Sequence, residues 1–263
     1  MVKLKILITG ANGYIGKSLY NALKSTHDVT VITRKDFDLT DSFETLKFFS
    51  DKYFDVVIHC AVSGGSRLKT DTWQVADNNL KMYYNLLSCD NRYNMLINLG
   101  SGAEIYSPES PYGFSKRAIA NSINEIPRFF NIRIYAVFDE NELNTRFIKA
   151  NLMRYINKEP MLIQNKRMTF FYMEDLITLI NHYINTPSTK LIKECNCGYI
   201  NTPSMLDIAN LINSLSDYKV PIYMNIDTVQ DYVSNYNAPY GLNYLGLQKG
   251  IIITYNRLLE CNQ

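Results

Sequence analysis

Short apolar runs alternate with longer stretches of mixed residues along the first half of the chain. Five runs are typical of buried strands: 4–10, 28–34, 54–62, 94–101 and 131–138. Between them, apolar residues recur at helical spacing, which predicts helices over 14–25, 42–53, 73–89 and 112–125. Because strands that alternate with helices form βαβ units, the pattern predicts an α/β fold with a Rossmann doubly wound parallel sheet, covered by helices on both faces.

The pattern in the second half of the chain is less regular. It predicts helices over 145–157 and 204–215, and a strand that runs into a helix over 168–185. We therefore expect a main domain over residues 1–140 and a smaller lobe over 141–263, which is interleaved with the last strands of the sheet.

Charge and hydropathy argue against two classes of protein. The chain has 263 residues, with 27 Lys and Arg against 25 Asp and Glu, and the formal charge of +2 leaves no basic stripe for nucleic acid. No apolar run approaches the ~20 residues that a bilayer span requires, and the chain starts with a strand-like run rather than a signal peptide. We therefore expect no nucleic-acid partner, no membrane segment and a cytoplasmic location.

The cysteines do not form a framework for disulfides or for a metal. They number five and are scattered, at Cys60, Cys89, Cys195, Cys197 and Cys261. Cys195 and Cys197 lie close together, but no second Cys/His pair accompanies them, and structural zinc normally takes four ligands. We expect reduced thiols and no metal site.

A glycine-rich loop joins the first predicted strand to the first predicted helix. Residues 9–16 have the sequence TGANGYIG. Gly10 permits a tight turn, Gly13 lets the backbone approach a pyrophosphate, and Gly16 allows the helix to pack closely on the strand. The helix N-terminus then offers N–H groups to the anion. The loop predicts a dinucleotide site with the candidate contacts Gly10, Asn12, Gly13, Tyr14, Ile15 and Gly16.

The end of the second predicted strand bears on the choice of dinucleotide. An acidic residue at this place binds a ribose 2′-OH, whereas an arginine accommodates a 2′-phosphate. Here the strand ends in Thr33, Arg34 and Lys35, and the first carboxylate is Asp36. The pattern therefore favours NADP(H) over NAD(H), with Arg34 as the contact to the phosphate. The alternative is that Arg34 faces solvent at a strand end.

The segment PYGFSK (111–116) places a tyrosine and a lysine four positions apart at the start of a predicted helix. Tyr112 and Lys116 then lie on one face, one turn apart. A neighbouring ammonium favours tyrosinate and lowers a phenol pKa from its usual ~10. Tyr112 can therefore exchange a proton with a carbonyl or alcohol oxygen while a nicotinamide exchanges a hydride with the carbon.

These motifs together resemble one family. The loop at 9–16 followed by YGFSK is similar to the extended short-chain dehydrogenases/reductases, which include nucleotide-sugar epimerases, dehydratases and reductases. The resemblance extends to residue 215, and the further similar segments are 59–62, 78–87, 170–176 and 195–212. It implies that residues 1–140 bind the dinucleotide and that residues 141–263 mainly bind the substrate.

The resemblance also implies roles for residues around the tyrosine. In the family, the lysine holds the nicotinamide ribose as well, and a Ser or Thr assists at the substrate oxygen. That Ser/Thr position corresponds to Gly102 in the predicted sheet segment 99–106, so Ser101, one step earlier, needs a local bulge or a water to serve. The connection from Ser101 to Tyr112 is shorter than in relatives, which leaves the sugar site more open or leaves a partner to close it.

The same resemblance implies further contacts. Those to the cofactor are Asp38 and Leu39 beside the adenine, Cys60, Ala61 and Val62 beside the adenosine, and also Asn79 and Val137. Arg146 and Arg167 are the nearest cations for the diphosphate of a nucleotide-sugar substrate. The helices at 73–89 and 112–125 resemble those of the family's usual dimer bundle, so we expect a homodimer.

The resemblance leaves two main activities open. NADPH-dependent reduction of a 4-keto (deoxy) nucleotide sugar, in activated-sugar biosynthesis, is favoured by Arg34 and by similarity to the GDP-fucose synthase and dTDP-4-dehydrorhamnose reductase branch. Tyr112 is then the general acid, and Lys116 lowers its pKa. The alternative is an NAD-dependent nucleotide-sugar 4-epimerase, which uses the same residues.

Two other activities fit the sequence less well. A non-catalytic dinucleotide-binding regulator agrees with the short loop after Ser101 but not with the intact Tyr/Lys pair. A dehydratase needs an acid/base pair beside the Ser/Thr position, and Glu104 lies two residues further on. The sequence names neither the sugar nor the nucleotide.

Overall fold

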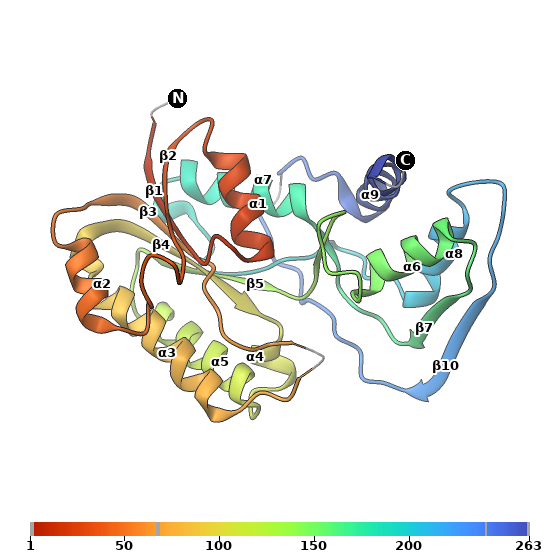
Figure 1. Cartoon of the computed structure of the whole chain (residues 1–263), viewed down its shortest axis with the longest axis horizontal. Helices are drawn as coiled ribbons and strands as arrows, with labels where there is room; N and C mark the ends of the chain where they lie inside the picture. Colours follow the sequence, from red (N-terminus) through yellow and green to blue (C-terminus); the bar gives the residue numbers. More distant parts are fainter. Residues whose placement is uncertain (1–2, 67–68, 240, 262–263) are drawn as a thin grey trace. The chain divides into compact units, whose positions relative to one another are not determined.

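A computed structural model describes residues 3–66, 69–239 and 241–261. The chain divides into two units, which Figure 1 shows with the helices and strands labelled. The first comprises Met1–Arg133 and Asn181–Cys195, and the second comprises Ile134–Ile180 and Asn196–Gln263. Each unit has its own hydrophobic cluster, and the two clusters share no described residue.

The main sheet has six strands in the order β2-β1-β3-β4-β5-β9. They are β1 (Lys5–Thr9), β2 (Asp28–Ile32), β3 (Phe54–His59), β4 (Tyr93–Ser101), β5 (Phe129–Ile134) and β9 (Glu194–Asn196). β1 pairs in parallel with both β2 and β3, and β3 pairs in parallel with β4. The chain therefore runs from β1 outward to β2 and then crosses back to β3 on the other side of β1. Open α/β sheets bind ligands at such a switch point, beyond the carboxyl ends of the strands.

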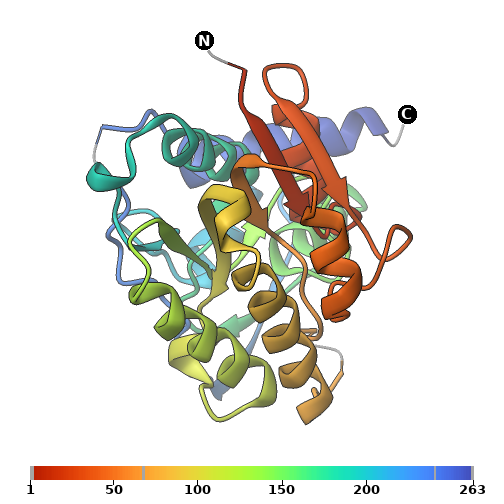
Figure 2. The ribbon, with the colours of Figure 1, turned by 90° about the vertical axis from the view of Figure 1, so that its left-hand side faces the viewer.

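Helices cover both faces of this sheet. In the first unit they are α1 (Tyr14–Leu23), α2 (Ser42–Phe49), α3 (Trp73–Leu87), α4 (Ala103–Tyr106) and α5 (Pro111–Asn124), with short 3-10 helices at Asp90–Arg92 and Ser188–Lys190. Figures 1 and 2 show α3 and α5 side by side on one face, whereas α1 lies on the other. The predicted α/β class and Rossmann doubly wound sheet are confirmed.

Apolar side chains hold α3 and α5 on the sheet. Leu7, Val57 and Leu96, from β1, β3 and β4, share one cluster with Leu86 of α3 and Ile119 of α5. None of these five side chains is more than 2% exposed. Burial of each such side chain contributes roughly 1.5–3 kcal/mol, so this face is the main anchor of α5, the helix that carries Tyr112.

Local chemistry sets the start of α5. Ser110 is the N-cap residue, and its hydroxyl accepts a hydrogen bond from the Gly113 N–H at 3.1 Å. Pro111 follows at the first helical position, where its fixed φ suits a helix and its missing N–H costs nothing. Tyr112 therefore lies in the first turn, with Lys116 one turn later.

The second unit contains two small sheets and four helices among its described residues. Its elements are β6 (Val137–Phe138), α6 (Phe147–Ile156), β7 (Met161–Asn165), β8 (Phe171–Tyr172), α7 (Met173–Asn185, which ends in the first unit), α8 (Met205–Asn213), β10 (Ile222–Thr228) and α9 (Gly246–Cys261). β10 pairs in parallel with β7, and β6 with β8. The core of this unit includes Leu152, Tyr155, Ile208 and Ile251.

The sheet segment predicted over 99–106 was wrong in its second half. β4 ends at Ser101, and Ala103–Tyr106 form the short helix α4. The Glu104 carboxylate accepts a hydrogen bond from the Ser101 N–H at 2.7 Å, and Ser101 Oγ accepts one from the Ala103 N–H at 3.2 Å. Side chains that bind nearby backbone N–H groups offer the chain an alternative to the sheet ladder.

Other differences lie further along the chain. The single strand predicted over 131–138 is two, because β5 ends at Ile134 and β6 pairs with β8. The sequence analysis did not predict β7, β10 or α9. In β10 the apolar residues Tyr223 and Ile226 are exposed by 60% and 82%, so burial does not impose an alternating pattern there.

Candidate active site

The glycine loop turns directly against the backbone that follows β3. Gly10 has a φ of +67°, and its N–H donates to the Ile32 carbonyl at 2.9 Å. A Cβ at Gly10 would lie 2.6 Å from Cα of Ala61. Both the left-handed backbone and the close approach therefore require glycine at this position.

The first turn of α1 follows the loop at once. Gly13 is the N-cap residue and, having no side chain, cannot cap the helix. The first intrahelical bond joins the Lys17 N–H to the Gly13 carbonyl at 2.9 Å, so the N–H groups of Tyr14, Ile15 and Gly16 precede it. A Cβ at Gly16 would lie 2.6 Å from the Gly10 carbonyl oxygen, so glycine is needed here for close packing. This end of α1 can present its N–H groups to a phosphate.

A buried polar pair joins the ends of β1 and β3. Thr9 Oγ1 lies 2.8 Å from Nδ1 of His59 and accepts a hydrogen bond from the Ala61 N–H at 3.2 Å. Burial, together with the charge of Lys116, lowers the pKa of His59 to about 3, so the imidazole is neutral. The pair fixes the segment of half-buried Cys60, Ala61 and exposed Val62 beside the glycine loop.

Asn79 of α3 ties this segment to α5. Its Oδ1 accepts a hydrogen bond from the Ser63 N–H at 2.7 Å, and its Nδ2 donates to the Ser63 carbonyl at 3.1 Å. The same amide also donates to Ser115 Oγ at 3.1 Å. Asn79 is only 2% exposed, so these bonds form away from water and rigidify the site.

The structure brings Tyr112 and Lys116 together as the spacing predicts. Lys116 Nζ lies 5.9 Å from the centroid of the Tyr112 ring and donates a hydrogen bond to the Leu99 carbonyl at 2.7 Å. Burial lowers the pKa of Lys116 to about 8, against the opposing effect of Glu104. A Cβ at Gly65 would lie 2.8 Å from Cζ of Tyr112, so the loop after β3 packs on the ring.

Ser101 lies at the last position of β4 and is half-buried. It is held by the two hydrogen bonds that close the turn into α4, which places it at the carboxyl edge of the sheet, two positions after the carbonyl that accepts from Lys116. Its assistance at a substrate oxygen remains a prediction.

Two carboxylates that follow β2, those of Asp36 and Asp38, accept hydrogen bonds from residues in their own turns. Asp36 accepts hydrogen bonds from the N–H and hydroxyl of Thr33 at 2.8 and 2.9 Å, and Asp38 accepts two from Thr40, both at 2.9 Å. These bonds lower the pKa of both carboxyls. Arg34, by contrast, is exposed. The first turn after β2 thus presents Arg34 to solvent, while the Asp36 carboxylate, which is also exposed, is engaged with Thr33.

Leu39 lies in the core rather than at the surface. Its side chain is 4% exposed and belongs to the cluster between sheet and helices. Its carbonyl accepts a hydrogen bond from Asn85 Nδ2 at 2.8 Å. The side chain therefore supports the turn, and a contact to adenine would have to come from the backbone or from the exposed Asp38.

The predicted substrate contacts in the second unit each have a carboxylate neighbour. Arg146 is the N-cap residue of α6, and its Nε lies 3.4 Å from Glu142 Oε1. Arg167 is paired with Asp231 at 2.9 Å, and its side chain is 58% exposed. Val137 of β6, which is a predicted contact of the cofactor rather than of the substrate, is 4% exposed. None of these contacts tests a role toward a ligand, which remains a prediction.

A comparison with protein families identifies the chain. The model described as "NAD dependent epimerase/dehydratase family" matches residues 6–198, which include the glycine loop, Tyr112 and Lys116. The chain belongs to the NAD dependent epimerase/dehydratase family. The family resemblance and the enzyme class predicted from the sequence, an NAD(P)-dependent enzyme of the extended short-chain dehydrogenase/reductase type, are therefore confirmed.

Individual relatives in this family are distant. CDP-abequose synthase of Yersinia pseudotuberculosis is 21% identical over 243 residues, covering 81% of this chain and 85% of that protein. GDP-L-colitose synthase of the same organism is 25% identical over 259 residues, covering 82% and 83%. Among solved structures, GDP-mannoheptose C4 reductase of Campylobacter jejuni with NADP bound has a TM-score of 0.81 at 18% identity, covering 98% of each chain. At 18% sequence identity, this structural similarity shows that the two proteins share a fold and nothing more.

No group of three or more His, Cys, Asp or Glu that could hold a metal occurs among the described residues, and the five cysteines are free thiols. Within the described ranges, no helix is long and apolar enough to cross a membrane.

The sequence analysis did not predict two polar pairs near the carboxyl edge of the sheet. One is the Thr9–His59 pair, whose signal was a polar residue at the end of each of two buried strands. The other is Glu104, which faces inward and binds the Arg133 guanidinium at 2.8 Å. No sequence signal marked that pair, because its members are far apart in the chain and belong to different elements.

Proposed function

We propose that this chain reduces a 4-keto (deoxy) nucleotide sugar with NADPH, as a step in activated-sugar biosynthesis. The observation that carries the proposal is the buried Lys116 beside the ring of Tyr112, at the carboxyl edge of the sheet that also bears the glycine loop. The substrate class is supported by the relatives, whose names are those of a CDP-sugar synthase, a GDP-sugar synthase and a GDP-sugar C4 reductase.

The residues around the switch point fit a dinucleotide. Glycines stand where a Cβ would collide with backbone, and the uncapped end of α1 suits the pyrophosphate. The proposed cofactor contacts are Gly10, Asn12, Gly13, Tyr14, Ile15, Gly16, Arg34, Asp38, Leu39 (through its backbone), Cys60, Ala61, Val62, Asn79, Tyr112, Lys116 and Val137. Arg146 and Arg167 are the proposed contacts of the substrate diphosphate.

Reduction of the ketone needs a hydride and a proton. When bound, NADPH supplies the hydride to the carbonyl carbon. Tyr112 donates its phenolic proton to the carbonyl oxygen, which becomes the hydroxyl of the product, and solvent then returns a proton to the tyrosine. The Lys116 ammonium stabilises the transient tyrosinate, and Ser101 Oγ donates a hydrogen bond to the same substrate oxygen.

The proposed homodimer uses the helices α3 and α5. Trp73 and Phe114 are exposed by 61% and 44%, and their rings meet edge to face with centroids 5.5 Å apart. Tyr84 on α3 is exposed by 47%. Exposed aromatic side chains gathered on two neighbouring helices are typical of a surface that is covered by a partner.

The preference for NADPH depends on Arg34. We expect the unmutated protein to bind NADPH more tightly than NADH, because Asp36 is engaged with Thr33 while Arg34 is exposed. Arg34→Ala should erase most of this preference, a loss of ~1.5–3 kcal/mol for a hydrogen bond to a charged group. Fluorescence titration with each cofactor measures it, and Lys35→Ala, which removes the neighbouring exposed cation, is the matched control. A preference of the unmutated protein for NADH would contradict the assignment.

The reaction itself is tested by its stoichiometry. A reductase releases oxidised cofactor in every cycle, so we expect one NADPH to be consumed per 4-keto nucleotide sugar, seen as a fall in absorbance at 340 nm as product forms. We also expect the purified protein to carry substoichiometric cofactor. Tightly bound NAD that survives purification, with sugar isomers interconverted without added reductant, would instead establish the 4-epimerase, since an epimerase regenerates its cofactor on the enzyme.

A further inference from the structure

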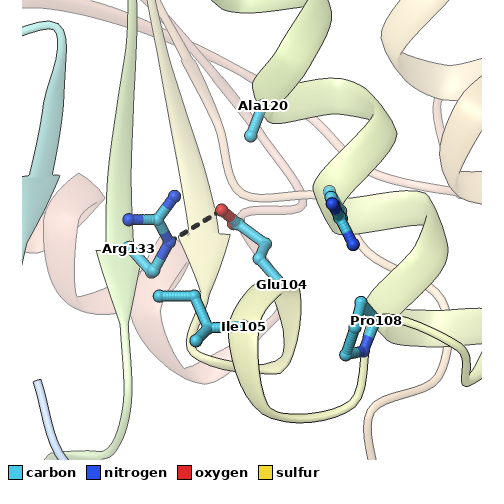
Figure 3. Close-up of a pocket in the computed structure, with 6 residues that line it drawn as sticks. Glu104, Ile105, Pro108, Ala120 and Arg133 are labelled. Atoms are coloured by element: carbon cyan, nitrogen blue, oxygen red, sulfur yellow. Dashed lines mark hydrogen bonds and ion pairs between the residues drawn. The ribbon is translucent and has the colours of Figure 1, made fainter.

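A carboxylate is buried where β4 meets α4. Glu104 is 5% exposed, and Figure 3 shows its side chain directed toward Arg133 of β5. Glu104 Oε2 accepts hydrogen bonds from Arg133 Nε at 2.8 Å and from Asn131 Nδ2 at 3.1 Å, while Oε1 accepts one from the Ser101 N–H at 2.7 Å. The pair borders a pocket of about 340 Å³ that is lined by Glu104, Ile105, Pro108, Arg117, Ala120 and Arg133.

Burial of this carboxylate costs free energy, and the neighbouring backbone at Gly100 leaves room for it. A Cβ at Gly100 would lie 2.4 Å from Glu104 Oε1 and 2.5 Å from Asn131 Oδ1. Burial raises the pKa of the Glu104 carboxyl, with the Arg133 charge opposing the rise. Buried ion pairs contribute little net stability compared with apolar side chains of the same volume, because both charges lose their water. The stability of the sheet therefore does not explain why a carboxylate stands here.

The carboxylate holds two parts of the proposed site. Its bond to the Ser101 N–H closes the turn that carries Ser101 at the end of β4. It also anchors α4, against which α5 is packed without slack. A Cβ at Gly113 would lie 1.9 Å from the Ser107 carbonyl oxygen and 2.8 Å from that of Ala103. Because Tyr112 directly precedes Gly113, a shift of α4 moves the tyrosine.

We propose that Glu104 is a positioning residue: held by Arg133 and Asn131, its carboxylate sets the Ser101 turn and the short helix on which Tyr112 is seated. This inference rests on the proposed function of Tyr112 and Ser101. It also separates Glu104 from the acid/base role of a dehydratase. Its side chain is 2% exposed, and both of its oxygens accept hydrogen bonds from the protein itself.

The test compares two carboxylates that contact the same arginine. Glu104→Ala and the near-isosteric Glu104→Gln remove the positioning charge. The control is Glu194→Gln, because Glu194 pairs with the same Arg133 at 3.3 Å but its side chain is 32% exposed. We expect turnover to fall ~10²-fold in Glu104→Ala and ~10-fold in Glu104→Gln, as for displaced reacting groups, while the KM for the sugar and the Kd for NADPH change less than ~3-fold. Glu194→Gln should keep all three values.

The pH dependence of turnover provides a second readout, which a general loss of packing in the protein would not shift. The groups that act on the Lys116 ammonium come from three elements. They are Glu104 of α4, His59 and Cys60 at the end of β3, and Tyr112 on the same helix as Lys116. Near neutral pH the cysteine and histidine are uncharged, because burial raises the pKa of Cys60 to about 12 and lowers that of His59 to about 3. Loss of the Glu104 charge therefore lets Lys116 deprotonate at lower pH, and the alkaline limb of turnover moves down in Glu104→Gln but not in Glu194→Gln.

The outcomes separate this inference from the function beneath it. If Glu104→Gln keeps the turnover and the alkaline limb of the unmutated protein while Tyr112→Phe is inactive, the positioning role is overturned. The reductase proposal then stands. Full activity of Tyr112→Phe would overturn the function instead. If Glu104→Ala does not fold, as judged by circular dichroism, Glu104→Gln alone decides.

Discussion

Tyr112→Phe is expected to lower turnover by ~10²–10⁴-fold while the affinity for NADPH changes little. The substitution keeps the ring that packs against Gly65 but removes the proton that the substrate oxygen must receive. Turnover is measured with a 4-keto nucleotide sugar, and cofactor affinity by fluorescence titration.

Tyr53→Phe is the matched control for this experiment. It removes the same hydroxyl from a tyrosine before β3 that is 48% exposed, so turnover should stay within ~2-fold of the unmutated value, as for surface changes in general. If Tyr112→Phe retains near-full activity on the true substrate, Tyr112 is not the general acid and the proposed reaction is wrong.

Lys116→Met is expected to abolish turnover and at the same time stabilise the cofactor-free protein. Turnover should fall ~10³-fold or more, and NADPH affinity should fall with it, because the lysine is proposed to hold the nicotinamide ribose as well as to stabilise the tyrosinate. Stability rises because an ammonium that is only 5% exposed is replaced by an apolar side chain of similar length.

The pH dependence of the stability gain follows from the pKa of Lys116. Burial lowers this pKa from 10.5 to about 8 in the folded state. Below pH 8 both states are protonated, and the folded state bears the full cost of burying the charge. As pH rises from 8 to 10.5 the folded state loses its proton first, so the cost disappears. The gain should be ~1–2 kcal/mol at pH 7, after allowance for the lost bond to the Leu99 carbonyl, and should vanish above pH 10.5.

Urea unfolding at pH 7 and pH 10.5 measures this gain, with Lys81→Met as the control on the exposed side of α3. Lys81 is 55% exposed and pairs with Asp77, so its substitution should change the free energy of unfolding by less than ~0.5 kcal/mol. A Lys116→Met protein that is less stable at pH 7 would show that the buried ammonium is not a source of strain. The lowered pKa of Lys116 also predicts an alkaline limb in the pH profile of the unmutated enzyme. Turnover should fall above about pH 8, where Lys116 loses its charge.

The main architecture of the first unit could be predicted because its signals are local. The strands β1, β3 and β4 are mainly apolar, and burial on both faces of a parallel sheet leaves such runs in a sequence. The turn at Gly10 is equally local, since its positive φ of +67° excludes a side chain and follows from the glycine pattern of the loop itself. Tyr112 and Lys116 could be paired from spacing alone, since a helix places positions one turn apart on one face.

The tertiary structure decided where polar side chains point. The sequence showed that Asp36 lies two residues after Arg34, but only the fold shows that the exposed Asp36 carboxylate is engaged with Thr33. Leu39 is expected beside the adenine, and only the fold shows that its side chain belongs to the core cluster. These choices depend on which backbone groups lack partners nearby, and spacing does not reveal that.

The strands, the glycine turn and the Tyr112–Lys116 face were thus determined by the sequence itself, because each depends on neighbours within a few residues. The turn after β4 was decided only by the tertiary structure. Glu104 leaves the predicted sheet segment because Arg133 and Asn131, on a strand that forms much later in the chain, offer its carboxylate hydrogen bonds in a space that Gly100 leaves open. A buried charge is stable only where its partners converge, and that convergence is a property of the folded chain.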